Sequence, residues 1–186
     1  MPIPEFIVDL RRHVGHAPLW LIGCTAVVVR DRPPKIDRQD AMDDGQDPVQ
    51  EVLLVRRADT GVWSPVTGIV DPGEDPHVAA IREVWEEASV RAEVTSLVWV
   101  SAGDLVSHVN GDQARYLDHT FRCRYLEGDP RLGDDENVEV GWFAVDELPD
   151  LPPMFAQRIA VALADPPRPI LGKGDEPPTA RGGSSR

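Results

Sequence analysis

Residues 76–88 constrain the fold of this chain more than any other segment. At 100° per residue of a helix, Glu83, Glu86 and Glu87 fall on one stripe, within about 60° either side of Glu83. Apolar residues fill the opposite arc: Val78, Ala80, Ile81, Val84, Trp85 and Ala88. The pattern predicts an amphipathic helix that packs on a core through the apolar arc and turns its acidic stripe away from it.

The ends of this helix and the segments around it indicate an α/β fold. Asp75 is placed to cap the helix, and Pro76 suits the first helical position, where its missing N–H costs nothing. Apolar and β-branched runs predict strands on both sides of it, and the spacing of apolar residues predicts two more helices. The predicted strands are 20–30, 51–57, 63–70, 92–101, 115–125 and 138–143, and the predicted helices are 4–14 and 153–164. Strands with one helix in the middle and one near the end favour a helix–sheet–helix sandwich.

The 186 residues suffice for one domain with a sizeable core, which we place at 1–165. Within it, residues 31–50 are rich in Pro, Asp and Gln and lack apolar periodicity, so they are predicted to be a flexible loop insertion. Residues 166–186 consist largely of Pro, Gly, Ser and charged residues and are predicted to be a disordered tail.

The net charge and the two cysteines indicate which binding partners and which cellular compartment to expect. The net charge of −13 argues against nucleic acid or an anionic membrane as the main partner, although a metal ion would still allow an anionic substrate. Cys24 and Cys123 lie in apolar runs and are predicted to be buried and reduced, rather than a disulfide or a catalytic thiol. No stretch approaches the roughly 18 apolar residues of a membrane span. A cytoplasmic protein is expected.

The acidic stripe has two interpretations. Most charged helix faces are solvated surface. Here, however, Glu83 lies three and four residues before Glu86 and Glu87, and like charges at these spacings repel by a few tenths of a kcal/mol (about 0.2–0.5). A bound divalent cation would turn that repulsion into ligation by hard oxygen donors.

The wider spacing around the helix decides between them. Glu74 follows Gly68 after five residues. Seven residues later comes the run Arg82-Glu83-Val84-Trp85-Glu86-Glu87-Ala88-Ser89-Val90. This spacing resembles the signature of the Nudix hydrolase family. One position departs from that signature, because the closing Gly of the family is Ser89 here. Helix C-termini favour Gly for its left-handed backbone, so Ser89 is expected to add roughly 1 kcal/mol of strain or to change how the turn closes.

The resemblance implies an α/β/α sandwich with a mixed β-sheet and a metal site on the helix. By analogy the metal ligands are Glu83, Glu86, Glu87 and the carbonyl of Gly68, for Mg²⁺ or alternatively Mn²⁺. Arg82 would hold a glutamate in position, and Glu74 would brace the loop before the helix.

Two further groups of residues are candidates. Many family members add an acidic residue from a late loop, as a ligand or as the general base, and here Glu136 is the first choice and Glu139 the second. Arg56 and Arg57 end a predicted strand near the expected site and are candidates for contact with substrate phosphate. Adjacent strand residues point to opposite faces, so at most one of them is expected to make that contact.

The implied function is metal-dependent hydrolysis of a pyrophosphate bond in a small nucleoside diphosphate derivative, of the ADP-ribose or NDP-X kind. Two alternatives are an isopentenyl-diphosphate-isomerase-like enzyme on the same fold and a nucleotide-binding sensor without catalysis. The sequence does not identify the substrate, and a homodimer is possible.

Overall fold

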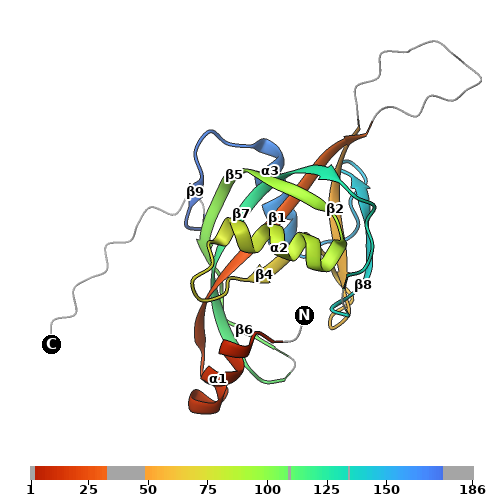
Figure 1. Ribbon diagram of the computed structural model, residues 1–186. Helices are drawn as coiled ribbons and strands as arrows, with labels where there is room; N and C mark the ends of the chain where they lie inside the picture. The colour runs from red at the N-terminus through yellow and green to blue at the C-terminus, as the bar shows by residue number, and fades with distance from the viewer. Residues whose placement is uncertain (1–2, 33–48, 109, 134, 174–186) are drawn as a thin grey trace, which may run out of the picture.

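The computed structural model describes residues 3–32, 49–108, 110–133 and 135–173. Three helices and nine strands make up this part of the chain (Figure 1). The helices are α1 (Glu5–Val14), α2 (Pro76–Ala88) and α3 (Pro153–Ala164). The strands are β1 (Leu19–Arg32), β2 (Val49–Arg57), β3 (Trp63–Ser64), β4 (Val66–Ile69), β5 (Arg91–Ala102), β6 (Val106–Ser107), β7 (Gln113–Glu127), β8 (Asn137–Ala144) and β9 (Ile170–Leu171).

The strands form one mixed sheet in the order β3-β2-β1-β7-β5-β9, with β4, β6 and β8 pairing outside this path. The central pair is parallel: β1 runs beside β7 from Leu19↔Ala114 to Val29↔Arg124. On its other edge β1 pairs antiparallel with β4 over 23–26 and with β2 over 29–32. The other long pairs, β5 with β7 and β2 with β8, are antiparallel.

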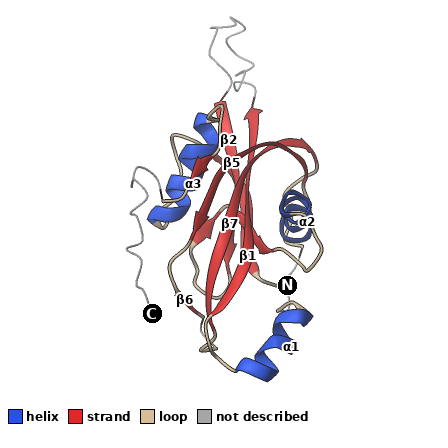
Figure 2. Ribbon diagram, turned by 90° about the vertical axis from the view of Figure 1, so that its left-hand side faces the viewer, coloured by secondary structure: helices blue, strands red, loops and turns tan. Residues whose placement is uncertain are grey.

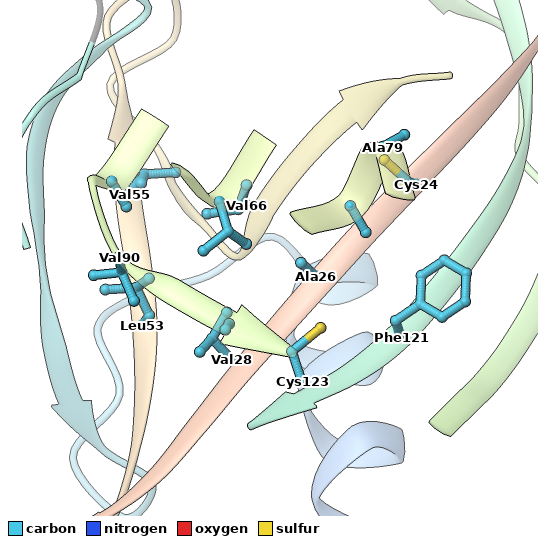
Figure 3. Packing of buried hydrophobic residues seen from close by; sticks show 14 of the residues in the cluster. Cys24, Ala26, Val28, Leu53, Val55, Val66, Ala79, Val90, Phe121 and Cys123 are labelled. Carbon is cyan, nitrogen blue, oxygen red and sulfur yellow. The ribbon is translucent and has the colours of Figure 1, made fainter. Parts of the chain in front are cut away.

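Helices cover both faces of the sheet, with α2 on one side and α3 on the other (Figure 2). The predicted α/β/α sandwich with a mixed sheet is therefore confirmed. Alternate residues of β1 serve the two faces. Cys24, Ala26 and Val28 belong to the core under α2 (Figure 3), and Val27 and Val29 belong to the core under α3.

Both cysteines are buried and free of any disulfide, as predicted. Both belong to the core under α2 (Figure 3). Burial raises the pKa of the Cys123 thiol to about 12 and raises that of Cys24 further, so both thiols stay protonated near neutral pH.

A buried ion pair fastens α3 to the central strands. Arg158 of α3 donates from Nη1 to Asp118 Oδ2 on β7 at 3.0 Å, and both side chains are less than a tenth exposed. Thr25 donates to the same Oδ2 and Thr120 to Oδ1, each at 2.9 Å. The carboxylate thus exchanges water for three donors, the condition under which a buried charge is tolerated.

The end of the domain differs from the prediction for residues 166–186. The chain continues past residue 166 and forms β9, which pairs in parallel with β5 through Trp99↔Ile170 and Val100↔Leu171. The Trp99 indole also donates to the Gly172 carbonyl at 2.6 Å. The predicted tail was therefore wrong for residues 166–173, which the structure places, and its remainder, 174–186, lies outside the described residues.

The predicted loop insertion, 31–50, is also shortened at both ends. β1 extends to Arg32 and β2 begins at Val49, and residues 33–48 lie outside the described part of the chain. Within the ranges that the structure describes, none of the helices combines the length and hydropathy needed to span a membrane.

Candidate active site

Helix α2 has the predicted bounds, Pro76–Ala88, but a different orientation on the sheet. Val78 and Trp85, predicted to face the core, are about half exposed, at 49% and 52%. Glu83 and Glu87, predicted to face away from it, are 4% and 2% exposed. That part of the prediction was wrong, because a helical wheel gives the angles between side chains but not the rotation of the helix on its sheet. The same side of α2 also buries Ala79, Ala80, Val84 and Ala88, so the two glutamates share the buried face of an amphipathic helix with small apolar residues.

The start of α2 needs a smaller correction. Asp75 occupies the N-cap position, with an extended backbone, and Pro76 follows it as predicted. The Asp75 side chain, however, makes no capping hydrogen bond. Its carbonyl accepts hydrogen bonds from the amides of Val78 and Ala79 at 2.9 and 3.1 Å.

Arg82 connects the glutamates of the site. It donates from Nε and Nη2 to the two carboxylate oxygens of Glu74, each at 2.9 Å, which is a bidentate pair. Its Nη1 donates to Glu83 Oε1 at 2.9 Å and to Glu86 Oε2 at 3.0 Å. Nη2 also reaches the carbonyl of Ile69 at 3.2 Å. One guanidinium therefore holds three carboxylates together and ties the loop before α2 to the helix.

Gly68 makes room for Glu83. A Cβ on Gly68 would lie 2.2 Å from the carboxyl carbon of Glu83, far inside van der Waals contact. The φ of Gly68 lies outside the left-handed region, so its backbone conformation does not call for glycine. The close approach of Glu83 is the feature that does. The Cys24 thiol, one strand away, donates to the Gly68 carbonyl at 3.6 Å.

Burial gives Glu83 an unusual proton affinity. Loss of water raises its pKa from 4.5 to about 7, and the carboxylates of Glu86 and Glu136 add to the rise. The charge and hydrogen bond of Arg82 act in the opposite direction without cancelling it. Carboxyls with such perturbed pKa values are concentrated at functional sites.

Glu87 is held from a distant part of the chain. Asn137, the first residue of β8, is itself buried and donates from Nδ2 to Glu87 Oε2 at 2.8 Å. Sequence analysis assigns no role to Asn137, although it lies between the two candidate acids Glu136 and Glu139.

Ser89 keeps the conformation expected of glycine. Its φ of 54° and ψ of 29° are left-handed, and its amide closes the helix on the carbonyl of Trp85 at 3.0 Å. The turn therefore closes as it does in a glycine-capped helix, so Ser89 does not change the closure. The expected effect that applies is backbone strain, because Ser89 holds a left-handed conformation with a Cβ.

The arginines that end β2 point to different surroundings, as their adjacent positions predicted. Burial lowers the pKa of Arg57, but its pairing with Asp59 at 3.0 Å outweighs that effect and raises the pKa, with smaller contributions from the nearby charges of Glu87 and Glu136. Arg56 instead pairs with Glu139 at 3.2 Å, and both of these side chains are exposed. The structure therefore groups Arg57 and Glu136 with the helix glutamates and leaves Arg56 and Glu139 outside.

The donors of the site fit a hard divalent cation. Glu83, Glu86 and Glu87 supply oxygen atoms, and the two buried carboxylates need a compensating positive charge. Among the residues that the structure describes, no three acidic, His or Cys side chains have closed to metal-binding geometry. Glu83 and Glu86 instead each accept a hydrogen bond through one oxygen from the same nitrogen of Arg82.

Comparison with known proteins identifies the family. Residues 42–165 match the family model of the NUDIX domain. The chain is 30% identical over 151 residues to a MutT-like protein of Streptomyces ambofaciens, and the match covers 80% of this chain and 77% of that protein. It is 35% identical over 108 residues to the NAD-capped RNA hydrolase NudC of Pseudomonas putida strain GB-1, where the match covers 55% of this chain and 35% of the relative.

Solved structures share the fold at lower identity. An ADP-ribose pyrophosphatase from Streptococcus suis aligns with a TM-score of 0.55 and 22% identity, over 82% of this chain and 97% of the other. A UDP-X diphosphatase aligns with a TM-score of 0.59 and 19% identity, over 90% and 74%. With the domain match over most of the chain and the glutamates gathered around Arg82, these findings show that the chain belongs to the Nudix hydrolase family of pyrophosphohydrolases.

Proposed function

We propose that this protein hydrolyses a pyrophosphate bond in a small nucleoside diphosphate derivative, of the ADP-ribose or NDP-X kind, with Mg²⁺ or Mn²⁺. The observation that carries the proposal is the arrangement of Glu83, Glu86 and Glu74 around Arg82, with Glu83 pressed against Gly68. Relatives by sequence or fold include enzymes named for cleaving NAD-capped RNA, ADP-ribose and UDP derivatives.

In this proposal Glu83, Glu86, Glu87 and the Gly68 carbonyl hold the cation. When bound, the cation neutralises phosphate charge and lowers the pKa of an attacking water. Arg82 keeps two of the carboxylates beside each other, and Asn137 fixes the rotamer of Glu87.

Glu136 is our choice for the late-loop acid, as a further ligand or the general base. It is close enough to Glu83 to raise the pKa of that carboxyl, whereas Glu139 is paired with Arg56 on the surface. Arg57 is the better placed of the two arginines to meet a substrate phosphate, because its surroundings include Glu87 and Glu136.

The isomerase alternative finds no support in the cysteines. Cys24 lies near Glu83, but burial and the charge of that carboxylate raise its thiol pKa, which suits packing rather than proton transfer.

A cytoplasmic location and a homodimer remain predictions. Preference for small molecules over RNA is a prediction from the net charge of −13.

The test is a panel of ADP-ribose, NDP-sugars, dinucleotides and an NAD-capped RNA, each assayed with Mg²⁺ and with Mn²⁺ for release of monophosphate. Glu86→Gln and Glu87→Gln should each lower kcat by at least about 100-fold while the fold is kept. Glu93→Gln on β5, a partly exposed carboxylate that pairs with Arg124, is the matched control and should leave kcat unchanged.

Each result has a defined meaning. Cleavage of the capped RNA alone would refute the small-molecule assignment. No turnover of any substrate would favour the nucleotide-binding sensor. Retained activity in both glutamine variants would refute the metal ligands.

A further inference from the structure

The C-terminal end of α2 is capped by a loop from another part of the chain, residues 128–133, which we name the capping loop. Arg131 donates its backbone amide to the Ala88 carbonyl at 3.0 Å, and Gly133 donates to the Glu87 carbonyl at 3.2 Å. The last carbonyls of a helix have no partner within the helix. The capping loop satisfies two of them at the turn that carries Glu86 and Glu87.

Gly133 lies too close to the helix for any side chain. A Cβ at this position would be 1.8 Å from the Glu86 carbonyl oxygen and 2.8 Å from its carbonyl carbon. Both atoms belong to the backbone of α2, so no side-chain rotation would relieve the overlap. The φ of Gly133 lies outside the left-handed region, so the close approach alone excludes a side chain there. Normal contact would require the loop to move by about 1.5 Å or more.

The residues that follow Gly133 belong to the candidate site. Glu136 accepts a hydrogen bond on its carbonyl from the Ala58 amide at 2.7 Å, and Asn137 donates to Glu87. The capping loop is therefore attached to α2 through Arg131 and Gly133, and Gly133 precedes by three positions the acid proposed to act with the helix glutamates. Only two residues separate Gly133 from Glu136, so we expect a shift of the loop to be transmitted to Glu136.

We propose that Gly133 is a positioning residue: by lacking a side chain it lets the capping loop close on α2 and so sets Glu136 at its distance from the helix carboxylates. The role of Glu136 rests on the proposed function, whereas the attachment of the loop does not. A test that reads the attachment directly can therefore fail independently of the activity.

The variant is Gly133→Ala in the full chain, with Gly103→Ala as its matched control. Gly103 also lies in a loop, has no left-handed φ and donates a backbone hydrogen bond, but a Cβ there would meet only the Tyr116 carbonyl at 3.5 Å. Amide hydrogen exchange is measured first, without metal or substrate. In Gly133→Ala the amides of Arg131 and Ala58 should exchange at least about 10-fold faster, because their hydrogen bonds to Ala88 and Glu136 open more often. In Gly103→Ala both rates should stay within about twofold of wild type.

Metal binding and turnover then test the positioning. Mn²⁺ affinity, measured by titration of Mn²⁺ alone, should fall about 10- to 100-fold in Gly133→Ala. With any substrate that the panel identifies, kcat should fall by about 100-fold while KM changes little. In a Glu136→Gln background, Gly133→Ala should add almost no further loss of kcat, because both changes then act through the same side chain.

Three outcomes would overturn the proposal. One is unchanged exchange at Arg131 in Gly133→Ala, which would show that the loop tolerates a side chain. Another is faster exchange at Arg131 with unchanged exchange at Ala58, which would show that Glu136 does not follow the loop. The third is full additivity of Gly133→Ala and Glu136→Gln in kcat. If the wild-type chain cleaves nothing on the panel, the proposed function fails and the exchange measurements still decide for or against Gly133.

Discussion

Replacing Glu83 with Gln should make the metal-free protein more stable at neutral and alkaline pH, although it removes a proposed ligand. Burial, supported by repulsion from Glu86 and Glu136, raises the pKa of Glu83 from 4.5 to about 7. The folded protein therefore binds the Glu83 proton more tightly than the unfolded chain does. The amide introduced by Glu83→Gln is neutral at every pH, and its oxygen can still accept the hydrogen bond from Arg82.

The sign and size follow from proton linkage. Below pH 4.5 the carboxyl is protonated in both states and contributes no pH dependence. Between pH 4.5 and about 7 the unfolded chain loses the proton first, so the free energy of unfolding falls as pH rises. Above pH 7 the loss is complete and amounts to about 3 kcal/mol, since each tenfold change in proton affinity is worth about 1.4 kcal/mol. Glu83→Gln should recover up to that amount.

The assay is urea denaturation with a metal chelator at pH 5, 6, 7 and 8, on wild type and Glu83→Gln in parallel. The difference in the free energy of unfolding cancels the other titrating groups. It should grow with pH up to 7 and then remain constant, with Glu83→Gln the more stable. A difference that stays constant from pH 5 to pH 8, or a Glu83→Gln protein that is less stable at pH 8, would refute the argument that Glu83 is buried at an energetic cost.

Two further changes test the stability of the fold. Ser89→Gly should raise the free energy of unfolding by about 1 kcal/mol, because glycine adopts the left-handed conformation without a Cβ clash; an unchanged urea midpoint would mean that Ser89 is unstrained. Arg158→Ala should lower it by about 3–5 kcal/mol by leaving Asp118 buried without its charged partner. The double change Arg158→Met with Asp118→Val should restore most of that loss in thermal denaturation, and a failure to do so would assign the loss to packing instead.

The sequence predicted most of the fold because the relevant signals are local. Proline at the first helical position and the apolar spacing gave the bounds of α2 without error. Runs of β-branched residues located six of the strand regions. β6 and β9 were not predicted, because strands of two residues have no periodicity. β9 is also held by contacts distant in the sequence, since it pairs with β5 and Trp99 lies some seventy residues before it.

The sequence pointed to the members of the candidate site but not to their contacts. The spacing identified Arg82 and the glutamates, yet the burial of Glu83 depends on Gly68 from β4 and that of Glu87 on Asn137 from β8. Such environments come from segments that only the folded sheet brings together. The close approach of Gly133 to α2 is of the same kind, since a single glycine in a polar loop has no distinguishing sequence pattern.

The parallel pairing of β1 with β7 has a consequence for synthesis of the chain. Partner residues such as Leu19 and Ala114 are about 95 residues apart, and α2 lies between them in the sequence. At the usual 5–20 residues per second, β1 waits roughly 5–20 seconds for its partner to be made. During that time its run of valines has one edge open to pairing with other chains, the kind of exposure that chaperones relieve. Helix α2 is thus made well before the sheet on which the burial of its glutamates depends is complete.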